Sequence, residues 1–201
     1  MRIALVTAPC DLEALYRFRH SIFVEDMGWL PPQPSRLLHD EFDESAHNYA
    51  AFGDDGQVIG SIRVVPDGLF GLPLERYAPP NALDDYRQGK TLAEFSRWAV
   101  HPSHARSLLG ARLMKAGFER MELMDATHGI LDASVDGKEI RLYQRAGFTR
   151  MGAEYVDRYH LGAMRCVTLN QRVKDVREVW PSARPGLHRF FTSVDPIIEH
   201  A

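Results

Sequence analysis

The feature of this sequence that most constrains its fold is a short turn between two apolar segments. Residues 53–56 read Gly-Asp-Asp-Gly, and they separate residues 47–52 from residues 58–65, both of which have the pattern of strands. Glycine and aspartate at such a turn favour a β-hairpin, because they adopt the positive φ angles that tight hairpins need. We therefore expect an antiparallel pair of strands, and with it a fold that contains a sheet.

The other segments alternate between helical and strand patterns. Apolar residues at helical spacing predict helices over 11–23, with Asp11 as the N-cap, over 108–126 and over 138–146. Further strands are expected at 91–100, 130–135, 148–151, 155–159 and 164–169. This order predicts an α/β (α+β) three-layer sandwich with a mixed central sheet.

Composition and charge exclude several classes of protein. With 201 residues, 45% hydrophobic and 25% charged, the chain is long enough for one globular domain, 1–201, and is not disordered or fibrous. A net charge of −3 and a pI near 6.3 give no reason to expect nucleic acid or an anionic membrane as partner. No apolar run approaches the roughly 20 residues of a membrane span. We expect a cytoplasmic protein in which Cys10 and Cys166 are unpaired thiols.

Common catalytic motifs are missing from the sequence. It contains no GxSxG elbow, no Walker loop and no GxGxxG followed by an acidic residue, which disfavours hydrolase, P-loop and Rossmann enzymes. Its nine histidines show no metal-ligand spacing such as HExxH. No metal site is therefore expected.

Polar and aromatic residues gather before the hairpin. Taken singly, Arg19 fits a solvated helix, Phe23 and Trp29 fit a core, and Asp40 and Asp43 fit the caps of a turn. Together they also suit a site. The aspartates can face a cationic ligand, the aromatic rings can pack its apolar part, and a guanidinium can hold a carboxylate.

Charged residues also interrupt two apolar strands. Arg63 stands in Gly-Ser-Ile-Arg-Val-Val, and Glu94 and Arg97 stand in Glu-Phe-Ser-Arg-Trp-Ala-Val. Strict alternation places Glu94 and Ser96 on one face and Phe95 and Arg97 on the other. Charges on such strands are costly to bury unless they are paired or face a ligand. A structural ion pair and a binding site both remain open for these positions.

In their order and spacing, these residues resemble the acyl-homoserine lactone synthase family, the autoinducer synthases of bacterial quorum sensing, which have a GNAT-like (N-acetyltransferase) fold. That family shows an arginine, a phenylalanine four residues later, a Gly-Trp pair, two aspartates three residues apart, a Gly-x-x-Arg strand and a Glu-x-Ser-Arg strand. The matching positions here are Arg19, Phe23, Gly28, Trp29, Asp40, Asp43, Gly60, Arg63, Glu94, Ser96 and Arg97. The resemblance covers about residues 12–172 and leaves 173–201 as a C-terminal extension.

The resemblance implies acyl transfer to S-adenosylmethionine, followed by lactone formation and release of methylthioadenosine. Both S-adenosylmethionine and the acyl thioester are substrates, and no cofactor is implied. Glu94 is the implied base, in a catalytic group with Ser96 and Arg97, and backbone N–H groups near Trp98 to Val100 are implied donors to the oxyanion. The implied substrate-binding residues are Arg19, Phe23, Trp29, Asp40, Asp43, Arg63, Trp98 and Val100.

The acyl donor is either acyl carrier protein or acyl-CoA. An acidic carrier needs a basic face, which Arg141, Arg145 and Arg150 would supply, although a solvated surface explains these arginines equally well. Two other functions remain open. One is an N-acyl amino acid synthase or another GNAT-like N-acyltransferase, and the other is a non-catalytic relative that binds acyl thioesters.

Overall fold

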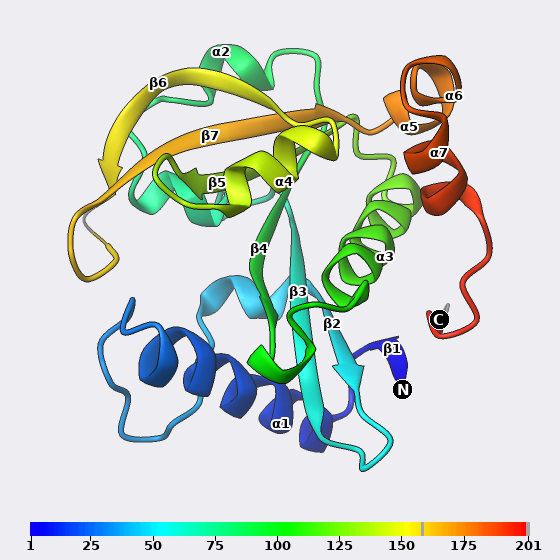
Figure 1. Cartoon of the computed structure of the whole chain (residues 1–201). Helices are drawn as coiled ribbons and strands as arrows, with labels where there is room; N and C mark the ends of the chain where they lie inside the picture. Colours follow the sequence, from blue (N-terminus) through cyan, green and yellow to red (C-terminus); the bar gives the residue numbers. More distant parts are fainter. Residues whose placement is uncertain (158, 200–201) are drawn as a thin grey trace. The chain divides into compact units, whose positions relative to one another are not determined.

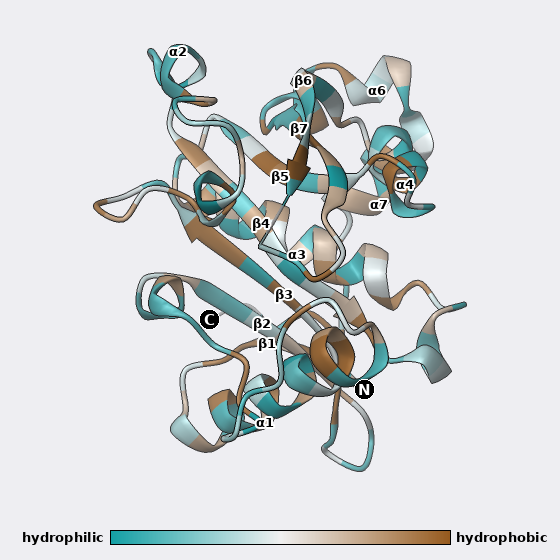
Figure 2. Ribbon diagram, turned by 90° about the vertical axis from the view of Figure 1, so that its left-hand side faces the viewer, coloured by the Kyte–Doolittle hydropathy of each residue, from teal (hydrophilic) through white to brown (hydrophobic). Residues whose placement is uncertain are grey.

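The expected hairpin forms, and it belongs to a mixed sheet. The computed structural model describes residues 1–157 and 159–199 (Figure 1). In it, β2 (His47–Phe52) pairs antiparallel with β3 (Val58–Pro66), with Asn48 opposite Arg63. Much of β3 is hydrophobic and is drawn brown in Figure 2. The turn therefore sets which polar side chains of the two strands lie side by side.

Seven strands follow the order β1-β2-β3-β4-β5-β7-β6. The pair β4–β5 is parallel, whereas β1–β2, β2–β3, β5–β7 and β6–β7 are antiparallel. The remaining strands are β1 (Arg2–Leu5), β4 (Leu92–Val100), β5 (His128–Ser134), β6 (Thr149–Asp157) and β7 (Met164–Arg172). The predicted mixed sheet is confirmed.

Helices connect the strands and complete the C-terminal extension. The α-helices are α1 (Pro9–His20), α2 (Asp84–Arg87), α3 (Leu109–Leu123), α4 (Glu139–Arg145), α5 (Asp175–Glu178), α6 (Trp180–Ala183) and α7 (Pro185–Thr192). A π-helix covers Ser21–Asp26, and short 3-10 helices cover Glu41–Glu44, Pro73–Arg76 and Pro102–His104. None of the described helices combines the length and the hydropathy that a bilayer crossing requires.

The chain divides into two compact units, each built from separate segments. The first comprises Met1–Val65, Phe95–Arg120 and Asp195–Ala201, and the second comprises Pro66–Glu94 and Met121–Val194. The division passes through β4, so the first three residues of that strand belong to the second unit.

Two helices cover opposite faces of the sheet in the first unit. Leu15 of α1 is fully buried and belongs to one core cluster with Ala50 of β2, which is paired with Ser61 of β3. Gly60 points to the other face, where a Cβ atom would lie 2.9 Å from Cδ1 of Leu113 in α3. Gly60 thus allows α3 to pack closely on its face of the sheet. Ser61 lies on the opposite face, which α1 covers.

In the second unit, α4 packs against β5, and the C-terminal extension packs beside the end of α4. Gly147 follows α4 with φ +100°, and a Cβ atom there would lie 2.7 Å from the ring of Trp180. Trp180 is 1% exposed, and its ring meets that of Phe191 at 5.4 Å between centroids. Glycine is therefore required at 147 both for its backbone angle and for this contact.

Two local predictions were wrong, and one strand was missed. Asp11 does not cap α1, because the helix begins at Pro9 after Ala8, and proline at the first helical position needs no donor. Strand β1 was not predicted, since four residues leave too little pattern to read. The segments predicted at 148–151 and 155–159 fall largely within one irregular strand, β6 (Thr149–Asp157), and residue 158 of the second segment lies outside the described residues.

Candidate active site

The loop that carries the candidate site leaves α1 through the π-helix and turns at Gly28. Gly28 has φ +62°, a conformation that suits glycine, and the N–H of Trp29 donates to the carbonyl of Phe23 at 2.9 Å. The π-helix is itself an uncommon geometry that occurs often at functional sites. This turn brings the loop that contains Asp40 and Asp43 back toward the sheet.

Asp40 and Asp43 cap the 3-10 helix Glu41–Glu44. The Asp40 carboxylate accepts a hydrogen bond from the N–H of Phe42 at 3.1 Å, and Asp43 accepts one from the N–H of Asp40 at 2.9 Å. This reciprocal arrangement holds both side chains in place. Asp40 and Asp43 therefore cap this turn, as one sequence interpretation expected, and they also contact the arginines.

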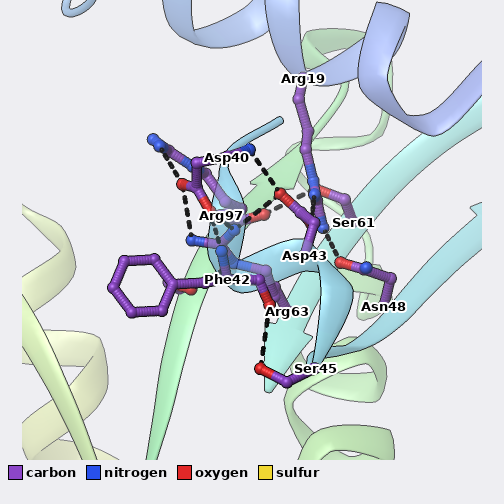
Figure 3. A network of polar contacts seen from close by, with 10 residues as sticks. Arg19, Asp40, Phe42, Asp43, Ser45, Asn48, Ser61, Arg63 and Arg97 are labelled. Atoms are coloured by element: carbon purple, nitrogen blue, oxygen red, sulfur yellow. Dashed lines mark hydrogen bonds and ion pairs between the residues drawn. The ribbon is translucent and has the colours of Figure 1, made fainter. Parts of the chain in front are cut away.

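Arg19 reaches this pair from the last turn of α1 (Figure 3). Its Nη1 lies 2.8 Å from Asp43 and its Nη2 lies 2.5 Å from Asn48 of β2, and the side chain is fully buried. Burial lowers the pKa of Arg19 to about 10, with Asp43 opposing the shift, so the guanidinium stays charged at neutral pH. Arg19 therefore binds other residues inside the network.

Arg63 is the centre of the network. Its Nη1 binds Asp40 at 2.6 Å and Asp43 at 2.8 Å, and its Nη2 binds Asp40 at 3.2 Å. Its Nε donates to the hydroxyl of Ser96 at 2.9 Å, and its side chain is only 1% exposed. Ser96 thus positions a guanidinium that holds both carboxylates, and Figure 3 shows Arg63 with Asp40 and Asp43.

Arg97 completes the network at its more accessible side. Its Nη2 lies 3.2 Å from Asp40, and its guanidinium carbon lies 5.9 Å from the centre of the Phe23 ring. The backbone of Arg97 has φ +49°, and its carbonyl accepts a hydrogen bond from Ser61 at 2.6 Å. Strict alternation along β4 was a wrong expectation here, because Ser96 and Arg97 both reach the same cluster.

The network carries an excess of positive charge. Burial raises the pKa of Asp40, but Arg63 and Arg97 outweigh that effect and hold it at about 2. Burial likewise opposes ionisation of Asp43, while Arg19 and Arg63 keep its pKa below the ordinary value. Three guanidinium groups thus face two ionised carboxylates. One positive charge is left over, which favours binding of an anionic group.

Asp40 and Asp43 do not by themselves present a cation site, as one sequence hypothesis held, because their oxygens bind arginines. They also line an open depression of about 520 Å³, together with Tyr16, His39, Leu12, Glu41 and Glu44. The rings of Tyr16 and His39 lie 5.0 Å apart there. Solvent therefore approaches the two aspartates from a side rich in carboxylates.

Phe23 and Trp29 form an aromatic pair beside Arg97. Their ring centres are 6.2 Å apart, and both pack in a cluster that includes Ala99 of β4. Phe23 is 6% exposed, whereas Trp29 is half-buried. The structure thus brings together seven of the predicted residues, which are Arg19, Phe23, Trp29, Asp40, Asp43, Arg63 and Arg97, with Ser96 bound to Arg63.

Other predicted residues lie outside this network. Glu94 is 1% exposed, and its carboxylate accepts a hydrogen bond from the N–H of Leu74 at 2.9 Å. Trp98 and Val100 pack at the first turn of α3, where a Cβ atom on Gly110 would lie 3.2 Å from the Trp98 ring and 3.6 Å from Val100.

Arg141, Arg145 and Arg150 are exposed residues of the second unit. The first two lie on α4, and Arg150 of β6 makes an exposed ion pair with Glu154 at 3.1 Å. Their surface position is compatible with carrier binding and equally with ordinary solvation.

Asn48 and Ser61 are network residues that the sequence analysis missed. Each is a small polar residue within an apolar strand, and both are at most 2% exposed. The hairpin turn offered a signal, because the register that it sets places Asn48 directly opposite Arg63. Asn48 lies beside the buried Arg63 and accepts a hydrogen bond from a second guanidinium, that of Arg19.

Comparisons with known proteins bear on the family and the fold. The family model of the N-acyl amino acid synthase FeeM matches residues 14–168. An acyl-homoserine-lactone synthase of Pseudomonas chlororaphis is 40% identical over 68 residues, which cover 28% of this chain and 35% of that protein. The match thus spans about a third of that relative's length.

Two solved structures share the fold. The structure of FeeM, an N-acyl amino acid synthase from uncultured soil microbes, superposes with a TM-score of 0.70 at 21% identity over 86% of this chain and 90% of that one. The CoA-dependent acyl-homoserine lactone synthase BjaI, with SAM and isopentyl-CoA, gives 0.67 at 21% identity over 98% and 92%. The expected resemblance and the GNAT-like fold are confirmed. The chain belongs to the family of the N-acyl amino acid synthase FeeM, a family of acyltransferases.

Proposed function

We propose that this protein is an acyl-homoserine lactone synthase. It transfers an acyl group from an acyl thioester to the amine of S-adenosylmethionine, and the acylated intermediate closes to a lactone with release of methylthioadenosine. The signal molecule that results would serve bacterial quorum sensing.

The observation that carries this proposal is the surplus guanidinium at Arg97. Among the described residues, its only hydrogen-bond acceptor is Asp40, reached through Nη2, so most of its five donors remain for a ligand. The network already satisfies Asp40 and Asp43 through Arg63, and an incoming carboxylate would neutralise the remaining positive charge. S-adenosylmethionine carries such a carboxylate beside the reacting amine.

The aromatic pair supports the same substrate. The Phe23 ring lies 5.9 Å from the guanidinium carbon of Arg97 and 6.2 Å from the Trp29 ring, so aromatic side chains stand beside the guanidinium that would hold a ligand's carboxylate. Adenine and a sulfonium-bearing chain both pack well against aromatic rings. The relative BjaI, whose structure contains SAM and isopentyl-CoA, supports the pairing of these two substrates.

The acyl-transfer step requires a neutral amine. We assign Glu94 as the base that removes the proton, directly or through water, while its hydrogen bond from Leu74 fixes the carboxylate. The amine nitrogen attacks the thioester carbonyl, the C–S bond breaks, and the thiol leaves with a proton. Backbone N–H groups near Trp98 and Val100 are the proposed donors to the oxyanion.

Lactone closure then needs orientation more than acid–base help. The carboxylate oxygen attacks the γ-carbon of the same molecule, the carbon–sulfonium bond breaks, and methylthioadenosine leaves with the electron pair. Arg97 holds that carboxylate, and Ser96 acts through Arg63 as a positioning residue. A substrate folded so that oxygen and γ-carbon are close reacts much faster than a free one.

A second candidate is an N-acyl amino acid synthase, which the match to the FeeM family model favours. Its substrate shares the amine and the carboxylate, so the same Arg97 contact applies. The two functions differ in the acceptor and in the step after acyl transfer, because an amino acid without a sulfonium has no leaving group for ring closure.

Product analysis separates these functions. Purified protein is incubated with S-adenosylmethionine or with the common amino acids, each with a series of acyl-CoA and acyl carrier protein thioesters, and the products are identified by mass spectrometry. Equal amounts of acyl-homoserine lactone and methylthioadenosine support the proposal. N-acyl amino acid without methylthioadenosine selects the second candidate, and thioester binding without turnover indicates a non-catalytic relative.

Two variants test the assigned roles. Glu94→Gln should lower kcat by roughly 100-fold or more and leave S-adenosylmethionine binding nearly unchanged. Glu13→Gln, which alters an exposed ion pair with Arg17, is the matched control and should be fully active. An equal loss of kcat and of binding in Glu94→Gln would remove Glu94 as the base.

The donor is tested on the exposed surface of α4 and β6. A triple change of Arg141, Arg145 and Arg150 to glutamine should raise KM for acyl carrier protein thioesters and leave KM for acyl-CoA unchanged. If the variant changed KM for acyl carrier protein thioesters no more than KM for acyl-CoA, these arginines would be excluded from carrier binding.

A further inference from the structure

A second group of buried polar side chains lies wholly in the second unit. Asp132 of β5, Asp157 at the end of β6 and Cys166 of β7 each place a possible ligand atom within 4.8 Å of the others. Asp157 is fully buried and Cys166 is 2% exposed. None of these residues has a part in the proposed acyl transfer.

The order of the strands creates this group. Strand β7 lies between β5 and β6, so Cys166 is opposite Ser134 on one side and Tyr155 on the other. Asp132 lies two residues before Ser134 on β5. Residues two apart on a strand point to the same face of the sheet, so Asp132 shares the face of these residues. Three strands thus contribute side chains to one point on the sheet.

The basic side chain that pairs with this group is His160, which contacts Asp157. Among residues 1–157 and 159–199, no lysine or arginine forms an ion pair with Asp132 or Asp157. Asp132 instead accepts a hydrogen bond from the hydroxyl of Tyr155, and Asp157 pairs with the Nδ1 of His160. Two buried carboxyl groups beside a thiol are costly unless protons or a cation neutralise them.

Their donor atoms suit a metal of borderline softness. A thiolate together with carboxylate oxygens and a nearby imidazole is a donor set for Zn²⁺, whereas Mg²⁺ and Ca²⁺ prefer oxygen alone. Ligand atoms around tetrahedral zinc lie roughly 3.3–3.7 Å apart, given bonds of about 2.0–2.3 Å. Separations within 4.8 Å therefore close to that geometry with movements of about 1 Å.

We propose that Asp132, Asp157 and Cys166 form a zinc-type metal site that joins β5, β6 and β7. One oxygen of each carboxylate and the deprotonated sulfur bind the ion, and water takes the fourth position. The proton of the Cys166 thiol is released to solvent on binding.

Neighbouring groups support this role. The N–H of Tyr159 donates to Oδ1 of Asp157 at 2.7 Å, while His160 binds Oδ2, so the carboxylate is oriented from two directions. Tyr155 does the same for Asp132. Hydrogen bonds of this kind orient ligands in known metal sites and raise affinity. The sequence analysis expected no metal because these ligands come from three strands and show no local spacing.

Cobalt binding tests the site without reference to catalysis. The full chain is stripped with a chelator, kept reduced with a phosphine, and titrated with Co²⁺ and, in parallel, with Zn²⁺. We expect about one ion per chain, a thiolate-to-cobalt charge-transfer absorption in the near ultraviolet, and a higher Tm with Zn²⁺.

The two cysteines of the chain provide a matched control. Cys166→Ser should abolish the charge-transfer absorption, and Cys10→Ser, at an exposed position, should retain it. His160→Gln should weaken Zn²⁺ binding by roughly 10- to 100-fold. If Cys166→Ser fails to fold, Asp132→Asn replaces it and should weaken Zn²⁺ binding. Absence of a cobalt–thiolate band in the parent chain, or its loss in Cys10→Ser, would overturn the proposal.

Discussion

Asp40 in the first unit and Asp132 in the second unit are buried in opposite ways. In the first unit, Asp40 and Asp43 are surrounded by three arginines, and the pKa of Asp40 is held at about 2. In the second unit, burial raises the pKa of Asp132 to about 6, while the hydrogen bond from Tyr155 opposes that shift. Asp40 is therefore a stronger acid than an ordinary aspartate, and Asp132 is a weaker one.

This difference shows what each interior is suited to bind. A buried carboxylate with a surplus of guanidinium groups is already neutralised, and the surplus attracts an anion such as a substrate carboxylate. Buried carboxyls without basic partners retain protons or exchange them for a cation. The first unit is thus prepared for a negatively charged ligand group, and the second for a positively charged one.

The largest expected effect follows from removing the central guanidinium. Arg63→Met leaves Asp40 and Asp43 buried with fewer partners, and breaking a buried ion pair from one side costs about 3–5 kcal/mol. Urea denaturation should show this loss. Arg150→Met, which breaks an exposed pair with Glu154, should change the free energy of unfolding by less than about 1 kcal/mol. Equal losses in both variants would contradict the central role of Arg63.

Acid should destabilise the first unit through Asp40. Its folded-state pKa of about 2 lies below the ordinary value of 3.8, so the unfolded chain binds the proton first as pH falls. About 2 kcal/mol of stability is present above pH 4 and is lost as pH drops toward 2. Asp40→Asn should lack this dependence, as measured by urea denaturation at a series of pH values. An unchanged slope in that variant would exclude Asp40 as its source.

Most of the first site could be predicted from the sequence because its residues stand out from their immediate neighbours in the chain. Charged residues in apolar strands, such as Arg63 and Arg97, are unfavourable to bury unless they are paired or bind a ligand. The hairpin turn specifies the register that brings Asn48 beside Arg63. What could not be predicted is the path of Arg97, whose positive φ departs from the alternation of an ideal strand. Such a departure depends on tertiary contacts that no local pattern contains.

The second group could not be predicted for a topological reason. Asp132 and Cys166 meet because β7 inserts between β5 and β6, and the sequence order of the strands would place β6 next to β5. Each residue alone is an ordinary aspartate or cysteine in a strand. Only the strand order turns them into neighbours, and strand order follows from the packing of the whole sheet.

Neutralising the second group should have the opposite effect to that in the first. In metal-free protein at pH 8, Asp132 is ionised against the preference of its surroundings, since its pKa is raised to about 6. Asp132→Asn keeps an acceptor for Tyr155 and removes the charge, so we expect a gain of roughly 1–2 kcal/mol in the free energy of unfolding at pH 8. With Zn²⁺ present the same variant should be the less stable one. A loss of stability without metal would show that the two carboxyl environments are alike.

The smallest expected effect concerns Ser96, which holds Arg63 without touching either aspartate. Ser96→Ala removes the acceptor for Nε of Arg63 and should cost about 1 kcal/mol in urea denaturation, far less than Arg63→Met. If Ser96 acts on the substrate only by positioning the guanidinium network, this variant should raise KM for S-adenosylmethionine several-fold and change kcat little. Ser96→Thr keeps the hydroxyl and should restore KM. A fall in kcat with unchanged KM would instead place the Ser96 hydroxyl at the reacting atoms, and the division between the binding network and the catalytic group would then have to move to include it.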